Sequence, residues 1–286
     1  MKIHLIGAGK MGLPMATHFL NAGHSVSVSD PSAERLALAR AAGLVVAELP
    51  AALAGAEVVF TSLPHDDALR AVGAQVARHA APGTVLVDTS TVSQAASAAV
   101  AQACEVAGVR YLRTTVSGNN KMAEAAQLTV MASGPRSVYD ALLPLLRLLG
   151  PNQFWLGEGE QARLMKLVVN LLIAQTSAML AEALTLGQKG GLAWRDMWDV
   201  LGASAVASPI LKAKAVQLKE RDFGATFTVP QMLKDVDLIL GEGAQAQVPL
   251  PQVALTRQML QAAQAQGFSD EDYAAIIKVV EASAAL

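Results

Sequence analysis

Three glycines near the start of the chain have a spacing that can bind a phosphate. Their segment, residues 7–12, follows a strand-like run and precedes a stretch with helical periodicity. This spacing suits a dinucleotide pyrophosphate. The strand turns at Gly7, the backbone comes close to the ligand at Gly9, and the helix packs closely on the strand at Gly12. The N–H groups and dipole at the start of the helix favour the negative charge. We therefore expect six residues to contact a cofactor: Gly7, Ala8, Gly9, Lys10, Met11 and Gly12.

An acidic residue follows at the distance that nucleotide binding requires. Asp30 ends a second strand-like run and lies 18 residues after Gly12, close to the roughly 20 expected of a carboxylate that bonds an adenosine ribose. Such a carboxylate accepts hydrogen bonds from the ribose hydroxyls and repels a 2′-phosphate, so it favours NAD, with NADP as the second choice. Asp30-Pro31-Ser32 is also a typical turn and helix cap, and Arg35 is close enough to contact a phosphate. Both alternatives stay open.

Composition and charge exclude several classes of protein. The chain has 286 residues, enough for two domains, and its 22 basic and 24 acidic residues give a net charge of −2 with no long run of either sign. Nucleic acid is therefore not an expected partner. The single cysteine, Cys104, leaves no disulfide or cysteine metal cluster, and the five histidines lack ligand spacing. We expect no metal and a cytoplasmic location, because no secretory signal precedes the first strand.

The most apolar stretch, residues 164–186, is long enough to resemble a membrane span. Lys166, Asn170, Gln175 and Glu182 interrupt it, and polar residues at such intervals are costly inside a bilayer. We interpret it as a buried helix between domains or subunits. The alanine-rich composition suggests closely packed helices, so we expect no membrane partner and a homo-oligomer, either a dimer or a tetramer.

Strand-like and helix-like segments alternate over the first half of the chain. Strands are expected at 3–6, 25–29, 44–46, 57–61 and 84–87. This alternation implies right-handed crossovers and a parallel, doubly wound sheet of the Rossmann type, in which ligands bind beyond the carboxyl ends of the strands. The glycine turn, Asp30, Ser62-Leu63-Pro64 and Asp88-Thr89-Ser90-Thr91 all fall at such ends.

The pattern changes after residue 109. We expect a short strand at 111–112, an irregular stretch at 113–123, strands at 128–132 and 153–156, and a helix at 138–149. Beyond residue 160 no convincing strand follows. The prediction is an α/β chain with an N-terminal Rossmann domain at 1–160 and an all-α domain at 161–286. Helices of the second domain are expected at 161–189, 193–201, 208–218, 229–241, 251–266 and 270–284.

Several of these segments, in this order, resemble the β-hydroxyacid dehydrogenase family, which includes 3-hydroxyisobutyrate dehydrogenase and tartronate semialdehyde reductase. The resemblance covers essentially the whole chain and is more specific than a glycine pattern alone. It rests on residues 7–16 with Asn21-Ala22-Gly23-His24, Leu63-Pro64, Asp88-Thr89-Ser90-Thr91, Val116-Ser117-Gly118, Lys166 with Asn170, and Leu233-Lys234-Asp235.

The resemblance implies hydride exchange between NAD and the carbinol carbon of a small hydroxy acid. By similarity, Lys166 is the general acid and base, and apolar neighbours at 164, 165 and 167 are expected to desolvate its amine and lower its pKa. Asn170 lies at i+4 on the same helix face, where it orients the amine or holds the substrate. The plainer alternatives are a surface lysine and an asparagine that bonds across a helix interface.

Binding roles follow from the same resemblance. Ser117 and Gly118 would hold the substrate carboxylate through a hydroxyl and a backbone N–H, although a plain turn is the alternative there. Around the cofactor, Leu63 and Pro64 would lie near the adenosine, Thr91 near the nicotinamide ribose, and Lys234 would close over the nicotinamide. Asp235 is expected to cap or pair structurally.

The chain departs from the family pattern in the segment expected to bind the substrate. Arg113-Thr114-Thr115 stands where the family has Asp-Ala-Pro, and Asn119 stands where a glycine follows Ser-Gly. Asn119 would add an amide donor to the substrate site. Arg113 either brings a positive charge to an anionic substrate or binds structural partners. Specificity is therefore expected to be shifted, whereas Lys166 argues that the reaction type is kept.

Two other functions compete with the dehydrogenase interpretation. A related imine reductase shares the architecture but generally lacks a lysine at this position. A non-catalytic NAD-binding protein of the same fold would tolerate the loss of Ser117, Lys166 and Asn170 together, and this chain has all three.

Overall fold

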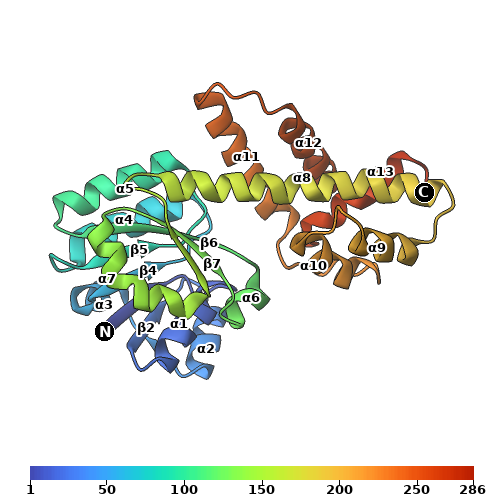
Figure 1. Ribbon diagram of the computed structural model, residues 1–286. Helices are drawn as coiled ribbons and strands as arrows, with labels where there is room; N and C mark the ends of the chain where they lie inside the picture. The colour runs from blue at the N-terminus through green and yellow to red at the C-terminus, as the bar shows by residue number, and fades with distance from the viewer. The chain divides into compact units, whose positions relative to one another are not determined.

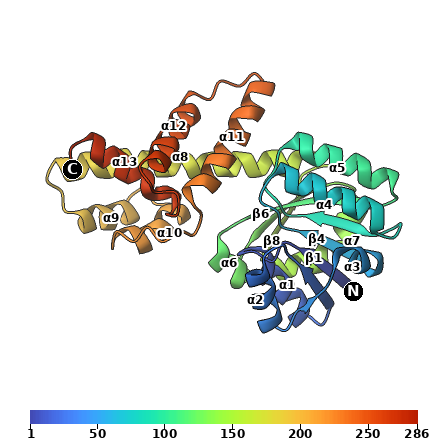
Figure 2. The same cartoon turned by 180° about the vertical axis from the view of Figure 1, so that it is seen from behind.

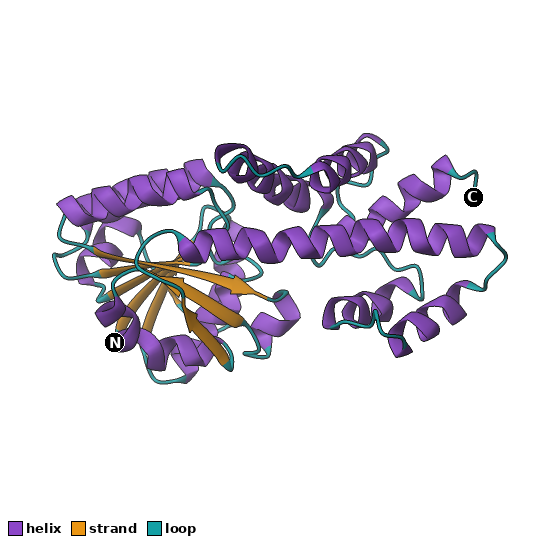
Figure 3. Ribbon diagram, turned by 45° about the horizontal axis from the view of Figure 1, so that its top comes forward, coloured by secondary structure: helices purple, strands orange, loops and turns teal.

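The computed structural model describes all residues from 1 to 286, and the chain forms two compact units, Met1–Lys166 and Leu167–Leu286 (Figure 1). The first unit contains every strand, and the second is made of helices (Figure 3). The predicted boundary at 160/161 coincides with the start of helix α8 (Gln161–Lys189). The division between the two units falls within that helix, after Lys166.

The first unit is built on one eight-stranded sheet with the order β3-β2-β1-β4-β5-β6-β7-β8. Neighbouring strands are parallel except for β6 and β7. The segment 118–128 between those two is too short for a parallel crossover, which needs a dozen or more residues. The strands are β1 (Lys2–Ile6), β2 (Ser25–Ser29), β3 (Val45–Val46), β4 (Val58–Thr61), β5 (Val85–Asp88), β6 (Arg110–Ser117), β7 (Thr129–Ser133) and β8 (Asn152–Trp155).

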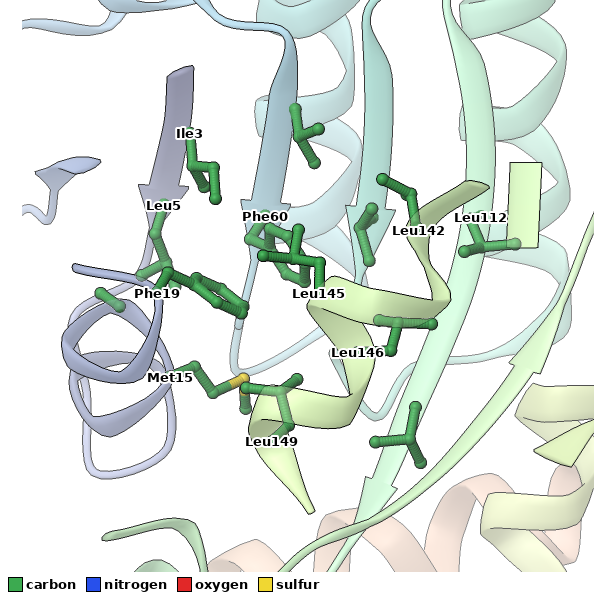
Figure 4. Close-up of a cluster of buried hydrophobic side chains, with 14 of the residues drawn as sticks. Ile3, Leu5, Met15, Phe19, Phe60, Leu112, Leu142, Leu145, Leu146 and Leu149 are labelled. Carbon is green, nitrogen blue, oxygen red and sulfur yellow. The ribbon is translucent and has the colours of Figure 1, made fainter. Parts of the chain in front are cut away.

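Helices cover both faces of this sheet, as Figure 2 shows. Most strand positions are accordingly apolar. One face packs against α1 (Gly12–Asn21) and α7 (Arg136–Leu146). In Figure 4, Phe19 of α1 lies beside Phe60 of β4, and Met15 of α1 lies near Leu149, just after α7. The other face packs against three further helices: α3 (Leu49–Gly55), α4 (Asp66–His79) and α5 (Gln94–Val106). The sheet therefore holds a core on each side.

The strand register aligns the four loops in which the sequence predicts the cofactor-binding segments. Ser29, Ile6, Thr61 and Asp88 are paired in turn across β2, β1, β4 and β5. The next residues along each strand begin the loops at 30, 7, 62 and 89, so all four loops leave the sheet at one edge. Helix α2 (Ala33–Ala41) begins just beyond the first of these loops. The expected doubly wound sheet is confirmed.

Two predicted elements were wrong. The stretch predicted as irregular contains part of helix α6 (Asn120–Glu124), and its residues 113–117 continue β6, where they pair with β7. They were missed because Arg113, Thr114 and Thr115 are polar, yet all three are buried. The helix predicted at 270–284 begins instead with a 3₁₀ turn at Tyr273–Ala275 and continues as α13 (Ile276–Ser283), because the Asp272 carboxylate caps the turn by accepting the Ala274 N–H.

The second unit surrounds the buried part of α8 with its own core, in which Trp198, Leu184, Val236 and Leu260 are fully or almost fully buried. By length and composition α8 could cross a membrane, and 44% of its most apolar window is buried within the chain. The remaining helices are α9 (Trp194–Ala203), α10 (Pro209–Leu218), α11 (Val229–Gln245) and α12 (Pro251–Ala265).

Candidate cofactor and substrate site

The glycine turn has the geometry of a pyrophosphate cradle. Gly7 has φ +98°, and a Cβ there would lie 2.3 Å from the carbonyl oxygen of Ser62; a Cβ at Gly12 would lie 1.9 Å from that of Gly7. At Gly9, by contrast, a Cβ would meet open space. Gly7 and Gly12 are therefore required by the turn itself, whereas Gly9 leaves room for a ligand.

The start of α1 also suits an anion. Met11 occupies the N-cap position without a side-chain cap, and no acidic residue lies in the first turn. The helix dipole is thus not offset by a carboxylate of the chain in that turn. Ala8 is buried and Lys10 is exposed. The residues present fit a dinucleotide pyrophosphate at this position.

Asp30 holds the glycine turn directly. One carboxylate oxygen accepts the Ala8 N–H at 2.8 Å, and the other accepts the Ser32 N–H at 2.8 Å. Ser32 caps α2 by accepting the Arg35 N–H at 3.3 Å. The turn-and-cap alternative is therefore present in the structure. The carboxylate can still accept further hydrogen bonds, because each of its oxygens has a second lone pair.

Leu63, Pro64 and Thr91 lie in the loops after β4 and β5. Leu63 is half-buried and donates its N–H to Ser90 Oγ at 2.9 Å, which links the two loops. Pro64 is exposed, and Thr91 is half-buried one residue beyond Ser90. These residues lie at the same sheet edge as the glycine turn.

A buried ion pair at this edge escaped the sequence analysis. Arg163, in the first turn of α8, pairs with Asp88 at the end of β5, and both side chains are 0% exposed. The guanidinium also donates to the carbonyl oxygen of Ser90 at 2.6 Å, to Tyr111 Oη at 2.9 Å and to Ser97 Oγ at 3.2 Å. Burial alone would lower the pKa of Arg163, but Asp88 and Tyr111 raise it above its usual value, so the group stays charged.

The signal that could have found this pair was weak. Each residue is a charge in an apolar context, Asp88 at the end of a buried strand and Arg163 in a largely apolar helix. Nothing local connects them, because they are 75 residues apart in the chain. Only the folded chain brings the start of α8 to the end of β5.

Ser117, Gly118 and Asn119 connect β6 to α6 (Asn120–Glu124). Ser117 ends the strand opposite Thr129. Gly118 has φ +138°, and a Cβ there would lie 2.6 Å from Leu128, so the turn requires glycine. Asn119 caps α6 through its side-chain oxygen, which accepts the Met122 N–H at 3.0 Å. The cap leaves the amide N–H₂ of Asn119 as its donor group.

Arg113 has a structural partner. Its guanidinium pairs with Glu160 just before α8 and lies over the Tyr111 ring, 4.8 Å from the centroid. Thr115, from the same departure, donates its hydroxyl to the carbonyl oxygen of Ala162 at 2.9 Å. Of the two alternatives for Arg113, the structure thus displays structural pairing, and both residues hold the start of α8.

Lys166 lies one turn after Arg163 and is half-buried. Among the three apolar neighbours expected to desolvate its amine, Leu167 is buried, whereas Leu164 and Met165 are 46% and 38% exposed. Asn170 follows at i+4 and is buried.

In the second unit, Asn170 is joined to α11. Its amide nitrogen donates to Asp235 Oδ2 at 2.5 Å, and Lys234 Nζ lies 2.7 Å from Asp235 Oδ1. Asp235 is buried, while Lys234 is about a third exposed. The motif of the long helix and the motif near the C-terminus therefore meet at one carboxylate, which confirms that Asp235 pairs.

The sheet order, the glycine turn and the uncapped start of α1 define a dinucleotide-binding protein of the Rossmann type. Residues 2–157 match the family described as the NAD-binding domain of 6-phosphogluconate dehydrogenase. Residues 160–280 match the family described as NAD-binding of NADP-dependent 3-hydroxyisobutyrate dehydrogenase. Both halves of the chain are therefore accounted for by nicotinamide-dependent dehydrogenase families.

Individual relatives agree with this class. The 2-(hydroxymethyl)glutarate dehydrogenase of Eubacterium barkeri is 34% identical over 98% of this chain and 95% of its own length. Glyoxylate/succinic semialdehyde reductase 2 of Arabidopsis thaliana is 28% identical over 99% of this chain and 80% of its own. The solved structure of Mycobacterium tuberculosis 3-hydroxyisobutyrate dehydrogenase with L-serine is 28% identical, with a TM-score of 0.88 over 97% of this chain and 98% of that one.

The chain belongs to the β-hydroxyacid dehydrogenase family, a class of NAD(P)-dependent oxidoreductases that act on hydroxy acids. The resemblance that the ordered motifs indicated is confirmed.

Proposed function

We propose that this protein transfers a hydride between NAD and the hydroxyl-bearing carbon of a small hydroxy acid, with Lys166 as general acid and base. The observation that carries the proposal is the anchoring of the first turn of α8 at the sheet edge where the cofactor loops emerge. Lys166 follows that turn directly, so the amine belongs to the region in which a nicotinamide would be presented.

Each proposed role is assigned to a named group. The nicotinamide, when bound, accepts or donates the hydride. In oxidation Lys166 takes the proton of the substrate hydroxyl, and in reduction it returns that proton. Ser117 Oγ and the Gly118 N–H are the donors proposed for the substrate carboxylate, with the Asn119 amide beside them. Because Asp235 holds the amide nitrogen of Asn170, that side chain presents its carbonyl oxygen, which suits an ammonium group on the same helix face.

The cofactor preference proposed is NAD. Asp30 is held at the end of β2 by Ala8 and Ser32, so a fixed negative charge lies where a ribose 2′-phosphate would approach. Like charges at short range disfavour binding. We expect kcat/KM with NADP at least about tenfold below that with NAD, which corresponds to roughly 1.4 kcal/mol of repulsion.

The substrate class is a small hydroxy acid, and the test is a screen of 2- and 3-hydroxy acids with NAD and with NADP, read as nicotinamide absorbance. Because Arg113 pairs with Glu160, the screen should include neutral side chains as well as the second carboxylate that 2-(hydroxymethyl)glutarate carries. Turnover of cyclic imines in place of every hydroxy acid would contradict the proposal. Activity confined to NADP would contradict the role of Asp30.

We also propose a soluble, cytoplasmic homo-oligomer. On α8, Leu172, Met179 and Leu186 recur at intervals of seven residues and are 62%, 61% and 77% exposed. An apolar stripe of this spacing packs well against another helix. A second copy of the chain is the occupant proposed, and the closed symmetry of most homo-oligomers suits either a dimer or a tetramer.

A further inference from the structure

Arg163 contacts the loop after β5 directly and the loop after β4 through Ser90. Its Nη1 donates to the carbonyl oxygen of Ser90 at 2.6 Å, and its Nη2 pairs with Asp88. Ser90 Oγ in turn donates to Asp88 Oδ1 at 2.5 Å and accepts the Leu63 N–H at 2.9 Å. One guanidinium is thus connected, through no more than one intermediate residue, to the two loops expected to hold the cofactor.

The turn of α8 that carries Arg163 is held at three further points. The Ala162 N–H donates to Ser133 Oγ of β7 at 3.1 Å, and the Ala162 carbonyl oxygen accepts the Thr115 hydroxyl of β6 at 2.9 Å. Glu160, just before the helix, pairs with Arg113 of β6. Asp88, Arg113 and Ser133 are register partners across β5, β6 and β7. The first turn of α8 therefore contacts a continuous row of three strands.

The physical value of this ion pair is geometric. A fully buried pair loses its hydration, so it adds little stability relative to apolar side chains of the same size. A planar guanidinium with several directed donors, however, fixes orientation far better than an ammonium does. The Asp88 carboxylate is also saturated, since Thr61 Oγ and Tyr111 Oη donate to it at 2.6 and 3.2 Å.

We propose that Arg163 is a positioning residue for hydride transfer, because it clamps the first turn of α8 to the cofactor loops and so sets where the Lys166 amine lies relative to the nicotinamide ring. The inference rests on the proposed role of Lys166. Lys166 is at i+3 from Arg163, so a shift of this turn moves the amine directly. A displacement of 1 Å at a reacting group costs on the order of 100-fold in rate.

The test compares three variants of the full chain. Arg163→Lys keeps the positive charge but loses the planar guanidinium with its several directed donors. Thr115→Val removes only the hydroxyl that holds Ala162. Arg195→Lys is the matched control, because Arg195 forms an exposed ion pair with Glu220 in the second unit. Each variant is measured for kcat, hydroxy acid KM, the pH dependence of kcat, NADH affinity and stoichiometry by nucleotide fluorescence, and melting temperature.

We expect Arg163→Lys to lower kcat by about 100-fold and to shift the apparent pKa in the pH dependence of kcat. The KM for the hydroxy acid should change by less than about threefold. Thr115→Val should lower kcat about fivefold, the equivalent of one hydrogen bond, with NADH affinity unchanged. Arg195→Lys should behave as the wild type. A role limited to folding would instead reduce the number of NADH sites and leave the pH profile unmoved.

A folded Arg163→Lys enzyme with the wild-type kcat and pH profile would overturn the inference. So would a loss of kcat that matches the loss of NADH sites. If Arg163→Lys does not fold, Thr115→Val decides alone, and a wild-type kcat in that variant overturns the inference. Lys166→Met keeps the two proposals apart: if it retains turnover, the proposed function fails whatever Arg163 does.

Discussion

At the residue scale, side chains that look catalytic and side chains that hold structure are mixed along the same segments. Asp30 holds the glycine turn and accepts the N–H of Ser32, the residue that caps α2, yet it also supplies the negative charge proposed to select NAD. Arg113 looked like a substrate contact and is paired with Glu160. Residue type alone could not separate these functions, because an arginine suits a buried ion pair and a bound carboxylate equally well.

His4 provides a prediction about pH and stability. It lies in β1, fully buried, with its ring nitrogens 2.8 and 3.0 Å from Ser27 Oγ and Ser29 Oγ. Burial lowers its pKa from 6.5 to about 4. Between these values the unfolded chain binds a proton that the native chain does not, so stability is present above pH 6.5 and is lost as the pH falls towards 4. The loss is up to roughly 3 kcal/mol.

Urea unfolding at several pH values checks this. His4→Val should lose less stability than the wild type between pH 6.5 and 4, and His79→Gln, which removes a partly exposed histidine, should follow the wild-type curve. Identical pH slopes for His4→Val and the wild type would show that His4 is not the source.

At the element scale, the cofactor site was predictable because each of its parts is a short sequence segment directly after a strand. The glycines, Asp30, Leu63-Pro64 and the 88–91 segment each follow their own strand, and the parallel sheet brings them to one edge. The clamp on α8 was not predictable, because Arg163 meets Asp88 and Thr115 meets Ala162 only after distant segments have packed. The extension of β6 was missed for the same reason.

The glycine turn gives a prediction that separates folding from binding. Gly9→Ala enters open space and should melt as the wild type does, with NADH affinity reduced by more than about tenfold because the methyl group obstructs the close backbone approach. Gly7→Ala meets the Ser62 carbonyl oxygen at a positive φ, so it should lower both the melting temperature and the affinity.

Nucleotide fluorescence and thermal unfolding measure the two effects. Gly55→Ala, at the end of α3 with open space around it, is the matched control and should leave both unchanged. Wild-type NADH affinity in Gly9→Ala would remove the cofactor from the glycine turn.

At the scale of the whole molecule, the chain combines an α/β unit with a helical unit, and one helix, α8, belongs to both. Its sequence is apolar on more than one side because part of it is buried in the second unit and part forms the exposed stripe at Leu172, Met179 and Leu186. Helical periodicity predicted the bounds of α8 correctly. It could not say which apolar residues would stay exposed, since that depends on how the other helices pack.

The stripe predicts the oligomeric state. Met179→Glu places a charge in the proposed contact with a second copy and should shift the protein to monomers in sedimentation or light scattering. Val216→Glu, at an exposed position on α10 that is not part of the stripe, should leave the assembly unchanged. A wild-type protein that is already monomeric at micromolar concentration would contradict the proposal.

The central claim is that Lys166 moves the proton while the nicotinamide exchanges the hydride. The most direct measurement compares wild type and Lys166→Met for NAD-linked oxidation of the best hydroxy acid, together with NADH affinity in the same preparations. We expect kcat to fall by at least about 100-fold, since positioned proton transfer contributes 10²–10⁴-fold, with NADH affinity within about threefold of the wild type. Normal turnover by Lys166→Met would contradict the mechanism.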